Sequence, residues 1–334
     1  MKNLSLLIVA VLLLTLSSNW QIQNSGVTVR LRGVSVVSDR VAWASGASSK
    51  VLRTGDGGAT WKALHVTDEA LDFRDVDAIS ERTAYVLSIG NGPASRIYKT
   101  TDAGKTWALQ FKTLDSKAFL DAMSFWDATH GLVIGDSIDG KFYVLITQDG
   151  GATWSRIPGD KLPPALENEG AFAASGTNIA VFDKTHAWIG TGAANKARVL
   201  YTTDGGHNWN VADTPLKSGQ SSGIFSIAFR DARHGVIVGG DYTKEKEAID
   251  NVAVTSDGGA TWTLGTGLSG FRSVVAYSQG VFIAVGPSGT DVSNDDGKTW
   301  TPLEGPGFDT FCFVKGNKLG WGSGAQGSIG KLSL

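Results

Sequence analysis

The chain of 334 residues is 42% hydrophobic and 19% charged, and its formal net charge is −2. This balance excludes the broad basic surface that nucleic acids or anionic membranes attract, so we expect no nucleic-acid partner. The single cysteine, Cys312, excludes an intrachain disulfide and a zinc site built from several thiolates. We therefore expect no metal and no cofactor.

The first 18 residues are typical of a secretory signal peptide. Lys2 is followed by the apolar run Leu4–Leu16, which is shorter than the about 20 residues that span a membrane. We expect residues 1–18 to be a signal peptide and residues 19–334 to form one propeller domain without a membrane span. The protein is then exported, to the periplasm or the medium. Retention of the segment as an N-terminal anchor is the alternative.

After this segment the chain repeats a pattern of four short strands. The first strand of each unit is apolar, as in Leu31–Val37 and Phe119–Phe125. The second strand is buried and ends in glycine, as in Leu132–Gly135, and a third short strand such as Val51–Thr54 follows. No sustained 3.6-residue apolar period is found after the first 18 residues, so the sequence predicts an all-β chain.

Each unit then closes with an aspartate-containing turn that ends in tryptophan, as in Ser256–Trp262. The Asp carboxylate can accept backbone N–H bonds across the turn, and Gly supplies positive φ without steric cost. The Trp buries a large flat surface against its neighbours. We expect the Asp and Trp of all six copies to be structural: Asp56, Asp102, Asp149, Asp204, Asp257, Asp295, Trp61, Trp107, Trp154, Trp209, Trp262 and Trp300.

Repeats of about 45 residues with four short strands predict the blades of a β-propeller. Six units are complete, whereas Phe308–Leu334 supplies only three strands, and Asn19–Gln23 has the pattern of the missing fourth strand. Joining the two ends completes a seventh blade and removes an exposed strand edge. The sequence predicts a seven-bladed β-propeller of four-stranded antiparallel blades, closed by N- and C-terminal strands that share the last blade.

With these motifs the sequence resembles the BNR/Asp-box repeat proteins, and among them the photosystem II stability/assembly factor family in its broad bacterial branch. The likeness rests on the six Asp turns and on the His130-Gly131 and His234-Gly235 turns before glycine-terminated strands. It implies that each Asp turn lies between the two outer strands of a blade, away from the central binding face. It also implies that the protein binds another protein. Sialidases and xyloglucanases carry the same turns, so the resemblance leaves a carbohydrate-active protein as the alternative.

Motifs of catalysis are either misplaced or lack the structure that they need. Arg156–Pro158 matches a sialidase motif but follows the third Asp turn instead of preceding the first. Gly219–Gly223 matches a nucleophile elbow, and Gly265–Gly270 and Gly322–Gly327 match a dinucleotide fingerprint, but no helix follows any of them. We therefore predict no catalytic residue and expect a non-enzyme.

Binding residues are predicted where the chain enters the inner strands and in its longest insertion, Pro158–Gly170. Pro163 and Pro164 stiffen this insertion, and a rigid charged loop loses little conformational entropy when it binds a partner. Arg30 and Arg32 are expected to add to a basic patch near the channel. The candidate binding residues are Arg74, Asp75, Asp121, Glu167, Glu169 and Arg272.

The favoured hypothesis is an exported, monomeric, non-catalytic propeller that binds a protein partner through its central face, in the manner of an assembly factor. The alternative is a sialidase- or glycosidase-like enzyme, or a glycan-binding protein, that uses the central depression. A glycosidase needs two carboxylates about 5–10 Å apart across such a depression. The carboxylates expected near the inner strands, and so the candidates for that role, are Asp75, Asp121, Glu167, Glu169 and Asp309.

Overall fold

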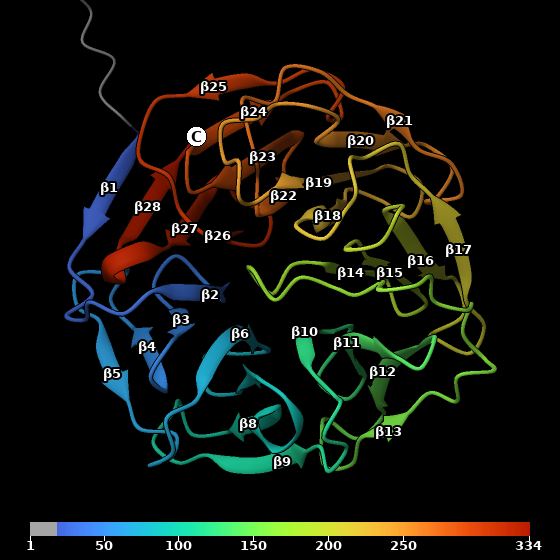
Figure 1. Ribbon diagram of the computed structural model, residues 1–334. Helices are drawn as coiled ribbons and strands as arrows, with labels where there is room; N and C mark the ends of the chain where they lie inside the picture. The colour runs from blue at the N-terminus through green and yellow to red at the C-terminus, as the bar shows by residue number, and fades with distance from the viewer. Residues whose placement is uncertain (1–18) are drawn as a thin grey trace, which may run out of the picture.

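The structure is a computed structural model that describes residues 19–334, so the signal-peptide prediction for residues 1–18 lies outside the described residues. Within this range, seven four-stranded antiparallel sheets form a closed ring around a central axis (Figure 1). This arrangement confirms the predicted seven-bladed propeller. Apart from the strands, the described chain contains two short 3-10 helices, η1 (Gly92–Ala94) and η2 (Ala325–Gly327).

The strands of each blade follow in sequence from the axis to the rim. Blades 1 to 3 consist of β2 (Leu31–Val36), β3 (Ala42–Gly46), β4 (Lys50–Thr54) and β5 (Lys62–Leu64); β6 (Asp72–Ala78), β7 (Ala84–Ile89), β8 (Arg96–Thr100) and β9 (Ala108–Lys112); and β10 (Leu120–Phe125), β11 (Gly131–Ile138), β12 (Lys141–Thr147) and β13 (Ser155–Arg156). Blades 4 and 5 consist of β14 (Ile179–Phe182), β15 (His186–Gly190), β16 (Arg198–Thr202) and β17 (Asn210–Asp213); and β18 (Ser222–Phe229), β19 (Gly235–Asp241), β20 (Val252–Thr255) and β21 (Thr263–Leu264). Blades 6 and 7 consist of β22 (Val274–Ser278), β23 (Val281–Gly286), β24 (Gly289–Ser293) and β25 (Thr301–Leu303); and β26 (Thr310–Phe313), β27 (Leu319–Ser323), β28 (Ile329–Ser333) and β1 (Trp20–Gln23).

The seventh blade joins the two ends of the described chain, as predicted. Strand β1 pairs antiparallel with β28 and supplies the outer strand of the last sheet. The Trp20 ring packs on Phe308, with ring centroids 4.7 Å apart. Gln23 Oε1 accepts hydrogen bonds from Trp61 Nε1 at 3.0 Å and Trp321 Nε1 at 3.1 Å, so it ties blade 1 to blade 7. Strand β1 thus covers the edge of β28 that a three-stranded last blade would expose.

The hydrophobic core lies between adjacent blades. One cluster, for example, joins Leu132 and Ile134 of blade 3 to Ile189 of blade 4. Trp188 is fully buried between blades 4 and 5, where its ring stacks on Phe229 at 3.5 Å. Such aromatic contacts bury large areas and fix the angle between blades.

The six Asp turns share one hydrogen-bond pattern between the third and fourth strands of their blades. In blade 5, Asp257 accepts bonds from the Thr255 hydroxyl at 2.8 Å and from the Thr261 backbone N–H at 3.0 Å and hydroxyl at 2.6 Å. The Thr255 hydroxyl oxygen accepts in turn from the backbone N–H of Gly259, which has φ +92°. The fourth strand begins one residue after the tryptophan. The turns therefore stabilise the outer hairpins, far from the axis.

The central channel is filled by the protein's own chain. The channel segment, residues 171–177, precedes β14 and lies in the middle of the ring, which the loop before β14 reaches (Figure 1). The Thr177 carbonyl accepts from the backbone N–H of Ile227 in blade 5 at 3.0 Å. The Ser175 hydroxyl donates to the Ser273 carbonyl at 2.7 Å, and the Ser175 carbonyl accepts from Thr310 at 3.1 Å. The segment divides the channel into two hollows, one at each face.

Candidate functional site

The arginine hollow lies at the face where the seven inner strands begin, and its volume is about 450 Å³. We call this face the arginine face and the opposite one, which carries the Asp turns, the Asp-turn face. The lining of the arginine hollow is Arg30, Arg32, Arg74, Phe119, Asp121, Asp136, residues 171–174, Phe225, Tyr242, Glu245, Phe271, Ser273, Pro287 and Asp309. Its size is typical of a site for a short segment or small molecule.

Four of the lining side chains sit on β-bulges of the inner strands. The register between the first and second strands shifts by one residue in blades 1, 2, 3 and 5. The extra residue is Arg32, Arg74, Asp121 or Phe225, respectively. A bulge re-aims its side chain and is frequent next to functional sites. The same local device therefore delivers each of these side chains to the channel mouth.

In blades 1, 3 and 5 a glycine of the second strand lies beside the bulge, whereas blade 2 has Ser88 at the equivalent position. A Cβ on Gly135 would lie 2.3 Å from the Phe119 carbonyl oxygen, and one on Gly46 would lie 2.2 Å from that of Arg30. A Cβ on Gly239 would approach the Gly223 carbonyl oxygen to 1.9 Å. Since these neighbours are backbone atoms, a larger residue would push the bulge out of place. These three glycines thus let the bulged backbone lie close to the second strand in blades 1, 3 and 5.

Blades 7, 1 and 2 supply the cationic side of the hollow. Arg30 binds Asp309 through two hydrogen bonds, Nε–Oδ2 at 2.7 Å and Nη2–Oδ1 at 2.6 Å. Arg74 Nε donates to Asp72 at 2.9 Å, and its Nη1 donates to the carbonyl of Ala173 in the channel segment at 3.0 Å. These two guanidinium groups are neutralised by their own carboxylates.

Arg32 has no such partner. Its Nη1 donates to the Ala174 carbonyl at 3.3 Å, and no carboxylate of residues 19–334 lies within ion-pair distance. Burial lowers the pKa of Arg32 to about 10, and the neighbouring Arg74 and Arg30 act in the same direction. Asp309 and Asp72 act on Arg32 in the opposite direction, but no ion pair within the described protein compensates the charge of this half-buried guanidinium, so it could pair with an anionic ligand.

Blade 3 supplies two acids that lack a cationic partner in the described chain. Asp121 is 1% exposed, and its Oδ2 has no hydrogen-bond partner there. Burial raises the pKa of Asp121 well above its usual range, and the nearby Asp136 adds to the effect. Burial also raises the pKa of Asp136 to about 6, although the carboxylate accepts the backbone N–H of Ala171. Within the described residues, no group of three or more His, Cys, Asp and Glu side chains could hold a metal ion.

Blades 4, 5 and 6 supply an aromatic wall. Phe172 of the channel segment stacks on Phe225, with centroids 4.0 Å apart, and its edge faces Tyr242 at 6.5 Å. Phe271 meets Phe225 edge to face at 4.7 Å. Phe225 and Phe271 are buried, whereas Tyr242 is 49% exposed and Phe172 is half-buried. An apolar group in the hollow would contact Phe172 and Tyr242, which the other two rings hold in place.

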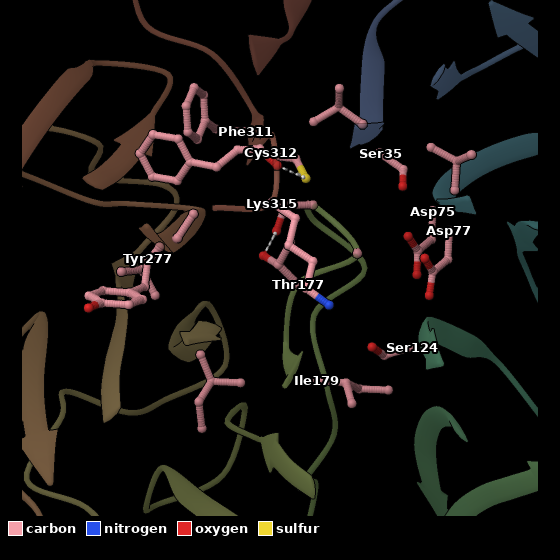
Figure 2. A pocket seen from close by; sticks show the side chains of 18 of the residues that line it. Ser35, Asp75, Asp77, Ser124, Thr177, Ile179, Tyr277, Phe311, Cys312 and Lys315 are labelled. Carbon is pink, nitrogen blue, oxygen red and sulfur yellow. Dashed lines mark hydrogen bonds between the residues drawn. The ribbon is translucent and has the colours of Figure 1, made fainter. Parts of the chain in front are cut away.

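The Asp-turn hollow lies at the other end of the channel and has a volume of about 350 Å³. Figure 2 shows Asp75 and Asp77 side by side on one wall and Tyr277 and Phe311 on the opposite wall. Burial raises the pKa of Asp75 well above its usual range and that of Asp77 to about 6. Each carboxylate accepts a backbone N–H of blade 3, from Met123 at 2.7 Å and from Phe125 at 3.0 Å. These bonds join blade 2 to blade 3.

The structure brings some of the predicted binding residues together and separates others. Arg74 and Asp121 line the arginine hollow, whereas Asp75 lies in the Asp-turn hollow. Arg272 is 1% exposed, and its guanidinium is bound by Asp291, with Nε–Oδ2 at 2.6 Å. Its charge is therefore satisfied inside the protein.

A buried ion pair fixes the position of the long insertion, Pro158–Gly170. The Glu169 side chain has no exposed surface and pairs with Arg198, and Glu169 Oε1 also accepts the Thr191 hydroxyl at 2.6 Å. Glu169 Oε2 accepts the backbone N–H of Leu166 at 2.8 Å, so the carboxylate closes the loop on itself. Glu167 is exposed and lines a separate polar groove. Glu169 thus positions the start of the channel segment.

Sequence reasoning missed the aromatic wall and Asp136. The wall had one signal: Phe225 occupies the position of Arg32 and Arg74 in the repeat. Phe172 gave no local signal, because it belongs to an irregular segment. This segment is held in the channel by its contacts with other blades, such as the hydrogen bond from Arg74 to the Ala173 carbonyl.

Comparison with solved structures shows similar folds. YCF48 bound to a D1 peptide has a TM-score of 0.66 at 16% sequence identity, with 95% of this chain and 97% of that chain covered. YCF48 from Cyanidioschyzon merolae has a TM-score of 0.66 at 17% identity, with 94% and 98% covered. The GH74 xyloglucanase from Xanthomonas campestris has a TM-score of 0.60 at 15% identity, with 93% of this chain and 53% of that chain covered. No family model and no curated protein sequence matches the chain.

These likenesses show the propeller fold and include both a protein-binding protein and a carbohydrate-active enzyme. At such low identity the fold alone carries over. In the described residues no helix is long and apolar enough to cross a membrane.

Proposed function

We propose that the protein is a non-catalytic propeller that binds a peptide segment of a protein partner in the arginine hollow. The observation that carries this proposal is the uncompensated guanidinium of Arg32, held on a bulge opposite an aromatic wall. An acidic side chain or a terminal carboxylate would pair with Arg32, and an apolar side chain would pack against Phe172 and Tyr242. The fold that this chain shares with YCF48 bound to a D1 peptide supports the proposal.

Such a site suits a segment better than a folded surface. The hollow of about 450 Å³ lies at the mouth of a closed channel, and the channel segment forms its floor. The floor and walls are fixed by hydrogen bonds between blades, so little order is lost when a ligand binds. Affinity would then come from a few buried contacts at the centre, with surrounding contacts that exclude water.

Partner capture from an envelope extract tests the proposal. Wild type, Arg32→Gln, Arg74→Gln and the control Arg40→Gln would be immobilised, and the captured proteins compared by mass spectrometry. Arg40 is an exposed residue in a turn of the Asp-turn face, so its loss should change nothing. We expect Arg32→Gln to lose the partner while its melting temperature stays that of wild type. Equal capture by all four proteins would contradict a role for the arginine hollow.

A glycan ligand is the second candidate, because the fold is also similar to that of a GH74 enzyme and because buried acids lie at both ends of the channel. In that proposal Asp75 or Asp121, each protonated through burial, would act as a general acid. Release of reducing ends from xyloglucan by the purified protein, abolished by Asp75→Asn or Asp121→Asn, would establish it. Absence of turnover combined with peptide capture favours the binding protein.

We further propose that the chain is exported as a monomer and that its Asp turns are repeats of the BNR/Asp-box type. The sequence of residues 1–18 and the shared turn geometry support these proposals. Cell fractionation with N-terminal sequencing of the mature protein tests export, and light scattering tests the oligomeric state. A cytoplasmic protein that begins at Met1 would contradict the first, and a dimer would contradict the second.

A further inference from the structure

The arginine hollow also holds two acids, Asp121 and Asp136, that pair with no cation of residues 19–334. Three buried acids of the protein are each paired with an arginine: Glu169 with Arg198, Asp291 with Arg272 and Asp309 with Arg30. By contrast, no cationic group of residues 19–334 lies within ion-pair distance of Asp121 or Asp136. A buried carboxylate without a cation is costly, so its presence at the mouth of a channel calls for an explanation.

Asp121 is the more informative of the two acids. Its Oδ2 is inaccessible and has no hydrogen-bond partner within the described chain, although the residue lines the hollow. The bulge in β10 is what turns this side chain out of the sheet ladder and into the channel mouth. Asp136, on β11 of the same blade, lies close enough to act on it electrostatically.

Arg32 and the two acids, Asp121 and Asp136, lie at different positions around the ring. Arg32 belongs to blade 1 and Asp121 to blade 3, with the neutralised Arg74 of blade 2 between them. The charges that act on Arg32 are those of Asp309, Arg74, Arg30 and Asp72, and Asp121 is not among them. The hollow therefore presents a guanidinium and a pair of acids from different blades, and Phe172 and Tyr242 belong to the same lining.

We propose that the arginine hollow takes a peptide segment that carries an acidic and a basic side chain around an apolar one. The acid pairs with Arg32, the base pairs with Asp121 and Asp136, and the apolar side chain packs on Phe172 and Tyr242. This inference rests on the proposed function, because it names the chemistry of the partner for the same site. A purely acidic segment would satisfy Arg32 but leave the blade 3 acids unpaired.

The experiment uses fluorescein-labelled peptides with phenylalanine at the centre, aspartate on one side and lysine one, two or three residues away on the other. For each spacing there is a matched peptide with norleucine in place of lysine and another with asparagine in place of aspartate. Binding is measured by fluorescence anisotropy with the full-length protein. The variants are Arg32→Gln and Asp121→Asn, and Glu167→Gln is the control, since it is an exposed carboxylate outside the hollow.

We expect the best spacing to bind wild type and Glu167→Gln about tenfold more tightly than its norleucine counterpart. Asp121→Asn should bind the lysine and norleucine peptides equally. If wild type binds both equally and Arg32→Gln binds neither, the proposed function stands and this inference is wrong. If Arg32→Gln also binds like wild type, or no peptide binds wild type, both are wrong. The lysine-to-norleucine comparison in wild type decides the matter even if Asp121→Asn does not fold.

Discussion

Removal of the Glu169 carboxylate should destabilise the propeller strongly. Glu169 is fully buried and accepts hydrogen bonds from Arg198, the Thr191 hydroxyl and the backbone N–H of Leu166. Glu169→Ala leaves the Arg198 guanidinium buried without an anion, which costs about 3–5 kcal/mol. It also frees the loop that leads into the channel segment, so the arginine hollow should lose its floor as well.

The cost can be converted into a melting temperature. The entropy of unfolding is about 2 cal/mol/K per residue, so for a chain of this length 1 kcal/mol corresponds to about 1.5 °C. Glu169→Ala should therefore melt about 5–8 °C below wild type in a thermal scan followed by tryptophan fluorescence. The control Glu167→Ala removes an exposed carboxylate two residues away and should melt with wild type. A Glu169→Ala variant that melts within a degree of wild type would refute the reasoning.

Three further predictions concern the ends of the ring, its turns and its buried acids, and a fourth concerns the thiol. Deletion of residues 19–24 removes β1 and should cause aggregation or a large loss of thermal stability. An unchanged melting temperature would contradict the role of β1 in closing the ring. Asp257→Ala removes the acceptor of the Thr261 N–H and should cost about 1–3 kcal/mol, whereas lost binding at full stability would assign Asp257 to a site. Burial raises the pKa of Asp77 from 3.8 to about 6. Between these two values the folded protein holds a proton that the unfolded chain has already released. The free energy of unfolding therefore falls as the pH rises from about 4 to about 6. Asp77→Asn should flatten this part of the melting profile, and an unaltered profile would contradict the shift. Burial raises the pKa of the Cys312 thiol to about 11, so a thiol reagent should label the native protein at neutral pH far more slowly than the unfolded chain, and prompt native labelling would contradict this.

The fold could be predicted from the sequence because its signals are local. Each Asp turn is written in seven consecutive residues, and its hydrogen bonds, such as those of Asp257, stay within four residues of the carboxylate. The lone strand at Trp20 indicated closure because the last unit lacked a fourth strand, and β1 completes it in the structure. Two second strands that were expected to end at glycine run further, because β11 continues past Gly135 to Ile138 and β19 past Gly239 to Asp241.

The site was less predictable because its residues are positioned by contacts distant in sequence. Arg272 was predicted as a binding residue together with Arg74, but β22 begins at Val274, after the arginine, and has no register shift. Arg272 therefore reaches Asp291 instead of the channel. The partner of Glu169, Arg198, lies 29 residues along the chain. No local pattern could separate such a buried pair from a solvated charge.

Two tyrosines on opposite faces of the channel allow the most direct test of the central claim. Tyr242 lines the arginine hollow and Tyr277 lines the Asp-turn hollow. Each would be replaced in turn by the photo-crosslinking residue benzoylphenylalanine, and the protein would be irradiated together with the captured partner. A crosslink to the partner from position 242 and none from position 277 is the predicted result. A crosslink from position 277 alone would place the binding site at the Asp-turn face and contradict the account.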